Sequence, residues 1–217
     1  GEYCAIAAAG SMSDMDAVRT VRARGIFMEH AAPEGTGAMA AVLGMDGEAV
    51  ERTVHDLQGV FIANYNCPGQ IVITGEKEAV EQSAAVLKEA GARRVLPLKV
   101  SGPFHSPMMK PAGEKLEEVL KKVSVKDPDI PYVTNVTAEV VKSGEAIKEL
   151  LVRQVSSSVR WEQSMRAMIA QGIDTFVEIG PGKTLSGFMK KTDKNVNMYR
   201  ISTWEEAETV CEELLKQ

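Results

Sequence analysis

The chain has 217 residues and a net charge of −5, with 44% hydrophobic and 25% charged residues. This composition is typical of a globular protein with one large or two small domains, and no basic cluster supports nucleic-acid binding. No apolar run approaches the ~18–20 residues of a membrane-spanning helix, and no basic leader marks a signal peptide. Three scattered cysteines, Cys4, Cys67 and Cys211, indicate a reducing compartment such as the cytoplasm rather than disulfides or a zinc site.

The first thirty residues predict two helices. An alanine-rich apolar stretch ends at Gly10, and Ser13 is a suitable N-cap for a second helix with two aspartates in its first turn. The chain begins without Met inside an apolar stretch, so we expect Gly1 to be a cut end. The second helix shows a rough apolar stripe of Ala17, Val18, Val21, Ile26 and Met28.

Residues 36–101 alternate between strand and helix patterns. Their order, β-α-β-β-α-β, is that of a ferredoxin-like unit. The predicted strands are 37–44, 60–66, 69–75 and 93–100, and the predicted helices are 47–57 and 76–91.

Alternation continues after His105, and it favours a parallel α/β sheet. The predicted helices are 111–123, 144–157, 158–172, 183–192 and 203–217, and the predicted strands are 130–136, 174–180 and 196–202.

The stretch "VSGPFHSP" contains His105, one of three histidines, between two prolines and after a glycine. A histidine on a loop that leaves a strand suits a general base, because its pKa lies near working pH. The alternative is a structural histidine in a turn. His30 and His55 occur in ordinary helical contexts and are predicted to lie at the surface or at its boundary with the core.

Two arginines and one glycine-rich turn are weaker indications of a functional site. Arg22 and Arg24 lie late in the second helix, where an arginine either faces solvent or grips a carboxylate with its two-pronged guanidinium. Gly180-Pro181-Gly182 precedes Lys183 but does not match a phosphate-binding loop, so we favour a structural turn there.

Together these pieces resemble the malonyl-CoA:acyl carrier protein transacylase family over essentially the whole chain. The resemblance rests on "GEY" with "AAG", "VRARG", "EGTGAMAAVLG", "NYNCPGQIVITG", "VSGPFHSPMMKPA", "LVRQVSSSVRW" and "EIGPGKTLSG". It implies an incomplete parallel-sheet α/β-hydrolase-like core of residues 1–35 and 102–217. A ferredoxin-like subdomain of residues 36–101 is inserted in this core, and the active site is expected in the cleft between the two.

The family's nucleophile lies in a G-H-S-L-G-E elbow, whose last two residues match Gly1 and Glu2. The resemblance therefore implies a serine two residues before Gly1 and a ping-pong transfer through a malonyl-serine ester. His105 resembles the base, and Gln154 the residue whose backbone carbonyl orients that base.

The resemblance also implies substrate-binding roles. Arg24 resembles the arginine that pairs with the free carboxylate of malonate, and Phe104 the residue associated with malonyl over methylmalonyl groups. Met28 is placed in the same substrate-binding group. Arg94 resembles a position that contacts a CoA phosphate.

The implied partners are malonyl-CoA and acyl carrier protein, without nucleic acid or membrane, and the expected state is a monomer. No cofactor or metal is expected, because the CoA thioester is a substrate. The serine and the oxyanion-hole amides are not among residues 1–217, so we expect these residues alone to be inactive. Two alternatives stay open: an acyltransferase domain of a polyketide synthase, and an inactive fragment or scaffold.

Overall fold

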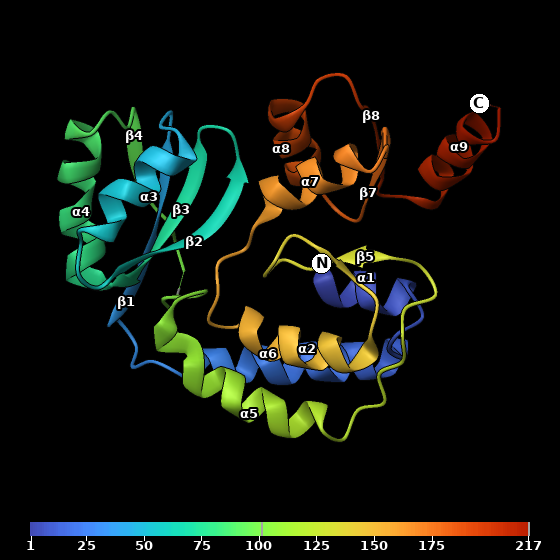
Figure 1. Cartoon of the computed structure of the whole chain (residues 1–217), viewed down its shortest axis with the longest axis horizontal. Helices are drawn as coiled ribbons and strands as arrows, with labels where there is room; N and C mark the ends of the chain where they lie inside the picture. The colour runs from blue at the N-terminus through green and yellow to red at the C-terminus, as the bar shows by residue number, and fades with distance from the viewer. Residues whose placement is uncertain (101, 217) are drawn as a thin grey trace. The chain divides into compact units, whose positions relative to one another are not determined.

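The computed structural model describes residues 1–100 and 102–216. It divides into two compact units, Gly1–Ser164 and Met165–Gln217. This division differs from the expected subdomain boundaries near residues 36 and 101, which stay a prediction. Figure 1 shows the elements of each unit in chain order.

Two helices open the first unit, α1 (Glu2–Ala8) and α2 (Asp14–Glu29). The Ser13 hydroxyl caps α2 as predicted, accepting a hydrogen bond from the Asp16 N–H at 3.1 Å. The predicted apolar stripe of α2 is wrong at Val18, Val21 and Ile26, which are exposed.

The buried face of α2 instead carries Ala17, Thr20 and Met28. Residues 17, 20, 24 and 28 fall on one side of a helix with 3.6 residues per turn. Arg24 therefore shares the inward face, and a pattern that counts only apolar residues misses this.

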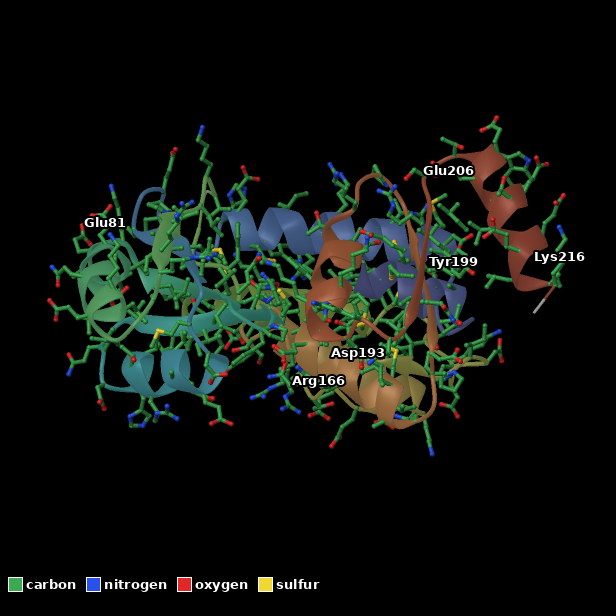
Figure 2. All side chains as sticks on the ribbon, turned by 90° about the horizontal axis from the view of Figure 1, so that it is seen from above. Glu81, Arg166, Asp193, Tyr199, Glu206 and Lys216 are labelled. Atoms are coloured by element: carbon green, nitrogen blue, oxygen red, sulfur yellow. The ribbon has the colours of Figure 1, made fainter. Side chains whose placement is uncertain are left out.

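The ferredoxin-like unit is present. It comprises β1 (Gly37–Leu43), α3 (Gly47–His55), β2 (Val60–Cys67), β3 (Gln70–Glu76), α4 (Lys77–Glu89) and β4 (Arg94–Pro97). The strand order is β2-β3-β1-β4 with antiparallel neighbours, and the apolar faces of α3 and α4 pack on the sheet. Glu81 lies on the exposed face of α4 (Figure 2).

The rest of the first unit is mainly helical. It contains the 3₁₀ turn η1 (Pro107–Met109), α5 (Lys110–Leu120), β5 (Tyr132–Val133), β6 (Val140–Val141) and α6 (Gly144–Gln154), followed by the start of α7 (Trp161–Ala170). Helix α5 lies beside α2 and α6 (Figure 1).

Two predictions for this region are wrong in extent. The strand expected at 130–136 is the two-residue β5, because the chain turns back through Ala138 at a φ of +59° and pairs with β6 in a hairpin. The helix expected from residue 158 begins at Trp161, because residues before it pair with the edge of β2.

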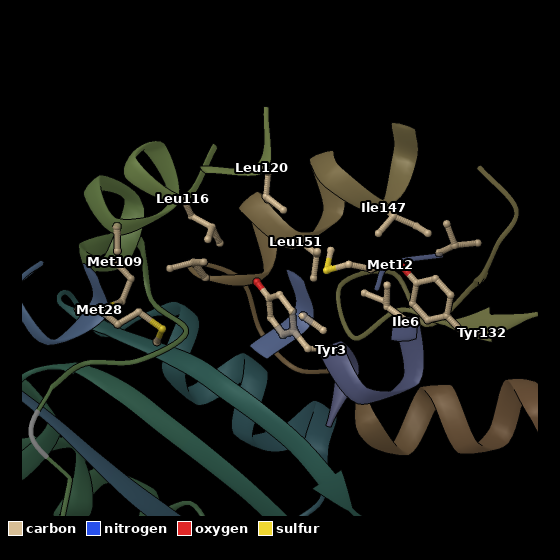
Figure 3. Close-up of a cluster of buried hydrophobic side chains, with 14 residues drawn as sticks. Tyr3, Ile6, Met12, Met28, Met109, Leu116, Leu120, Tyr132, Ile147 and Leu151 are labelled. Atoms are coloured by element: carbon tan, nitrogen blue, oxygen red, sulfur yellow. The ribbon is translucent and has the colours of Figure 1, made fainter. Parts of the chain in front are cut away.

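Buried side chains from α1, α2, α5 and α6 form the core of this helical part (Figure 3). Leu151 is fully buried there, on the helix that ends at Gln154. We expect Leu151→Ala to lower the free energy of unfolding by about 2–5 kcal/mol, because it leaves a cavity. Urea unfolding would measure this loss, and the exposed Val18→Ala is the control; equal effects would contradict the assigned core.

The second unit contains the end of α7, β7 (Thr175–Ile179), α8 (Thr184–Thr192), β8 (Asn197–Ile201) and α9 (Trp204–Leu214). Within the described residues the parallel sheet consists of β7 and β8, as expected for an incomplete parallel core. Figure 2 labels Tyr199 on β8 and Glu206 on α9.

The Gly180-Pro181-Gly182 turn connects β7 to α8. The Glu178 carboxylate accepts hydrogen bonds from the N–H groups of Leu185 at 3.0 Å and Ser186 at 2.8 Å. A carboxylate of the chain itself thus occupies the N-terminus of α8, which agrees with a structural turn.

In the described ranges, 1–100 and 102–216, no helix combines the length and the apolar character needed to cross a membrane.

Candidate active site

The loop that carries His105 is fixed by unusual backbone geometry. His105 has a φ of +59°, in the left-handed region that residues other than glycine rarely adopt. The next residue, Ser106, is fully buried, and its hydroxyl donates a hydrogen bond to the Pro103 carbonyl at 2.6 Å. Such conformations persist only where surrounding contacts enforce them, and they concentrate at functional sites.

The imidazole of His105 is held by two backbone carbonyls. Its Nδ1 lies 3.1 Å from the Gln154 oxygen and 3.1 Å from the Ser157 oxygen. Because a carbonyl can only accept, Nδ1 must carry the proton in both contacts. Nε2 of the neutral ring is then left with its lone pair, which is the form that a general base requires.

The two carbonyls are positioned by α6 and by the edge of the ferredoxin-like sheet. Gln154 ends α6, and Val159 then pairs with Asn64 of β2 in a single parallel bridge. The N–H of Tyr65 donates to the Val159 oxygen at 2.9 Å, and the N–H of Val159 donates to the Ala63 oxygen at 2.7 Å. Ser157 is therefore fixed on both sides, by a helix end and by a sheet edge.

The surroundings of His105 lower its pKa. Burial is the largest cause, and the positive charge of Arg24 adds to it, while the carbonyl contacts of Gln154 and Ser157 act in the opposite direction. The net shift keeps the ring neutral at pH 7, so that Nε2 can accept a proton.

Arg24 presents a partly buried guanidinium near His105. Burial lowers the pKa of Arg24, and the nearby Tyr3 and Glu2 partly offset this. Within the described residues, Arg24 Nε is buried and has no hydrogen-bond partner. A guanidinium with an unused donor is suited to bind a carboxylate, since the fork of Arg matches two carboxylate oxygens.

A cleft of about 620 Å³ opens beside His105. The ferredoxin-like unit forms one side, and the segment after α6 forms the other. Arg160 of that segment lies over the Tyr65 ring, 5.5 Å from its centre. The lining residues include Val54, His55, Phe61, Tyr65, His105, Ser157 and Arg160.

The structure brings some of the other predicted site residues near His105 and leaves others apart. Phe104 is partly buried and packs against both the helical core and the sheet. Met28 is a buried member of the helical core (Figure 3). Arg94 is exposed on β4, and the described lining of the His105 cleft does not include it. The roles expected of these residues stay predictions.

Sequence reasoning missed two contributors to this site. Ser157 acts through its backbone oxygen, so its side-chain identity carried no signal. Glu2 is buried, with 8% of its surface exposed, and receives hydrogen bonds from Thr134 and Gln154. The partners of Glu2 lie more than 130 positions away in the chain, so no local pattern could reveal them.

The site thus combines a neutral histidine, oriented by two backbone carbonyls, with a nearby partly buried guanidinium. The sequence model of the family described as "Acyl transferase domain" matches residues 1–210. The malonyl CoA-acyl carrier protein transacylase of Bacillus subtilis (strain 168) is 49% identical over 221 residues, covering 100% of this chain and 70% of the relative.

Solved structures agree with this match. An acyl carrier protein S-malonyltransferase from Vibrio cholerae has a TM-score of 0.94 and 40% identity, covering 97% of this chain and 70% of the other. A malonyl-transacylase in complex with its type II PKS acyl-carrier protein has a TM-score of 0.94 and 41% identity, with coverages of 98% and 70%. The chain belongs to the acyl transferase family, among its malonyl CoA-acyl carrier protein transacylases.

Proposed function

We propose that this protein transfers malonyl groups from malonyl-CoA to the pantetheine thiol of acyl carrier protein in fatty-acid synthesis. The observation that carries the proposal is the His105 ring, whose Nδ1–H is held by two carbonyls beside the Arg24 guanidinium. This pair provides a base and a counter-ion for an acyl group with a free carboxylate.

The proposed reaction has two half-reactions at one serine, which the resemblance places outside residues 1–217. His105 Nε2 takes the serine proton as the serine oxygen attacks the thioester carbonyl, and it returns that proton to the departing CoA sulfur. It then takes the proton of the carrier thiol, whose sulfur attacks the ester, and the serine oxygen recovers the proton. The carbonyls of Gln154 and Ser157 stabilise the imidazolium in both steps.

Arg24 supports the choice of malonyl over acetyl groups in this proposal. With malonate bound, the guanidinium gains a carboxylate partner; with acetate it stays buried and unpaired, which is unfavourable. Phe104, next to the base, would restrict the space for a methyl branch. In this proposal Met28 contributes to substrate binding from the helical core, and Arg94 contacts a CoA phosphate.

A second candidate is malonyl transfer to a carrier protein of a polyketide synthase. The observation that favours it is the 41% identity to a malonyl-transacylase that was solved with a type II PKS acyl-carrier protein. Comparing kcat/KM for fatty-acid and polyketide carrier proteins, with malonyl-CoA held constant, separates the two candidates.

We expect residues 1–217, prepared alone, to form no malonyl adduct with malonyl-CoA, because the proposed nucleophile is not among them. Intact mass spectrometry with and without malonyl-CoA measures this directly. The protein produced from its natural gene is the comparison, and it is expected to gain one malonyl group. A malonyl ester on residues 1–217 would contradict the assignment of the nucleophile. No adduct on either form would support an inactive scaffold.

A further inference from the structure

We propose that Glu2 is a positioning residue for His105 and acts through the side chain of Gln154, an inference that rests on the proposed function. Glu2 lies in the first turn of α1, and Gln154 is the last residue of α6. The side chain of Gln154 thus contacts Glu2, while its backbone oxygen contacts His105 Nδ1.

Both oxygens of the Glu2 carboxylate accept hydrogen bonds from buried side chains. One oxygen accepts a hydrogen bond from the Thr134 hydroxyl at 2.9 Å, and the other accepts from Gln154 Nε2. Both partners are buried, with 0% and 4% of their surfaces exposed. Removing the carboxylate would leave both donors without an acceptor, and that is costly in a buried site.

The end of α6 needs such an anchor. The last carbonyls of a helix have no partner within the helix, and helix ends fray readily. The Gln154 oxygen is one of these carbonyls, and it faces His105 together with the Ser157 oxygen. Fixing the Gln154 side chain to α1 restricts the rotation of that last turn, so both acceptors stay directed at the imidazole.

Burial is the largest influence on the Glu2 carboxyl, and it raises the pKa of this group. The hydrogen bonds from Gln154, Thr134 and the Asn135 backbone and the positive charge of Arg24 on α2 act in the opposite direction and only partly offset the burial. The other titratable groups near Glu2 are the phenols of Tyr3 on α1 and Tyr132 on β5. Burial raises the pKa of each phenol, so both are neutral. Neither phenol oxygen has a hydrogen-bond partner within the described residues.

Variants at both ends of this link test the inference. In the protein produced from its natural gene, Glu2→Ala and Gln154→Leu each remove the link but keep the Gln154 backbone oxygen. We expect each to lower kcat for malonyl transfer by about 10- to 100-fold, with KM for malonyl-CoA within about 2-fold, since only part of the base's contribution is lost. The double variant should lose no more than either single variant, because the two residues act as one unit. Glu2→Gln should recover most of the activity, since the Gln154 amide can flip and restore a hydrogen bond.

A second measurement does not use the substrate. The His105 Nδ1–H proton should give a slowly exchanging NMR signal that is lost in Glu2→Ala and Gln154→Leu but kept in Glu2→Gln. Thr134→Val is the matched control, because it removes the other hydrogen bond to Glu2 and leaves the Gln154 contact.

The two measurements separate the inference from the proposed function. Loss of the Nδ1–H signal in a protein that transfers no malonyl group would support the positioning role and contradict the proposed function. An unchanged signal in Glu2→Ala, or loss of activity in Glu2→Ala but not in Gln154→Leu, would overturn the inference.

Discussion

In the protein produced from its natural gene, replacement of His105 by glutamine is expected to reduce kcat for malonyl transfer by about 10³- to 10⁴-fold, the largest effect expected among the proposed variants. Glutamine keeps an N–H that can donate to the carbonyls of Gln154 and Ser157, so the loop can keep its path. It has no basic lone pair, so neither the serine nor the carrier thiol can be deprotonated. Single-turnover transfer from labelled malonyl-CoA would measure both half-reactions.

His55→Gln is the matched control for this experiment, because His55 lines the same cleft and is exposed. It should leave kcat unchanged. An equal loss in both variants would indicate a general disturbance of the cleft, and near-normal activity in His105→Gln would remove His105 from the mechanism.

The pH profile provides an independent check on the same residue. Because burial and Arg24 lower the pKa of His105, its neutral form persists below the ordinary histidine pKa of about 6.5. The acidic limb of kcat/KM should therefore lie below pH 6.5, and the NMR titration of His105 in the free protein should give the same midpoint. The same shift stabilises the fold above pH 6.5, and this contribution is lost as pH falls through the lowered pKa.

The parts of the fold that could be predicted are those determined by residues close together in the sequence. The ferredoxin-like unit follows from strand and helix periods, and the Ser13 cap follows from a hydroxyl before two aspartates. The strand expected at 130–136 fails because its apolar pattern cannot specify a partner, and the partner is a hairpin strand rather than the parallel sheet.

The candidate site also contains residues that the sequence predicts and residues that only the folded structure reveals. The prolines and glycine around His105 indicate a loop that holds the histidine in a fixed orientation. The resemblance predicts that the Gln154 carbonyl orients its ring. The second carbonyl, from Ser157, depends on the pairing of Val159 with the edge of β2, which joins segments about 95 positions apart. Arg24 was ambiguous because its inward orientation depends on Thr20 and Met28 sharing its side of α2. Only the packed helix distinguishes that face from the exposed side with Arg22.

The second large effect is expected at Arg24, where charge and shape can be separated. Arg24→Met should lower kcat/KM for malonyl-CoA by about 10²- to 10³-fold, because the malonate carboxylate would lie partly buried without its cation. It should also raise the pKa of His105 towards its ordinary value, since the positive charge of Arg24 holds that pKa down.

Arg24→Lys keeps the charge but loses the two-pronged fork, so it should leave the His105 pKa low while still reducing kcat/KM for malonyl-CoA. Acetyl-CoA, which has no carboxylate to bind, should be affected little by either change. Arg22→Met, two residues earlier on the exposed side of α2, is the matched control and should alter neither quantity. If Arg24→Met lowered transfer from malonyl-CoA and acetyl-CoA equally, Arg24 would support the site without selecting the acyl group. If only the His105 pKa moved, Arg24 would tune the base and the malonate carboxylate would bind elsewhere.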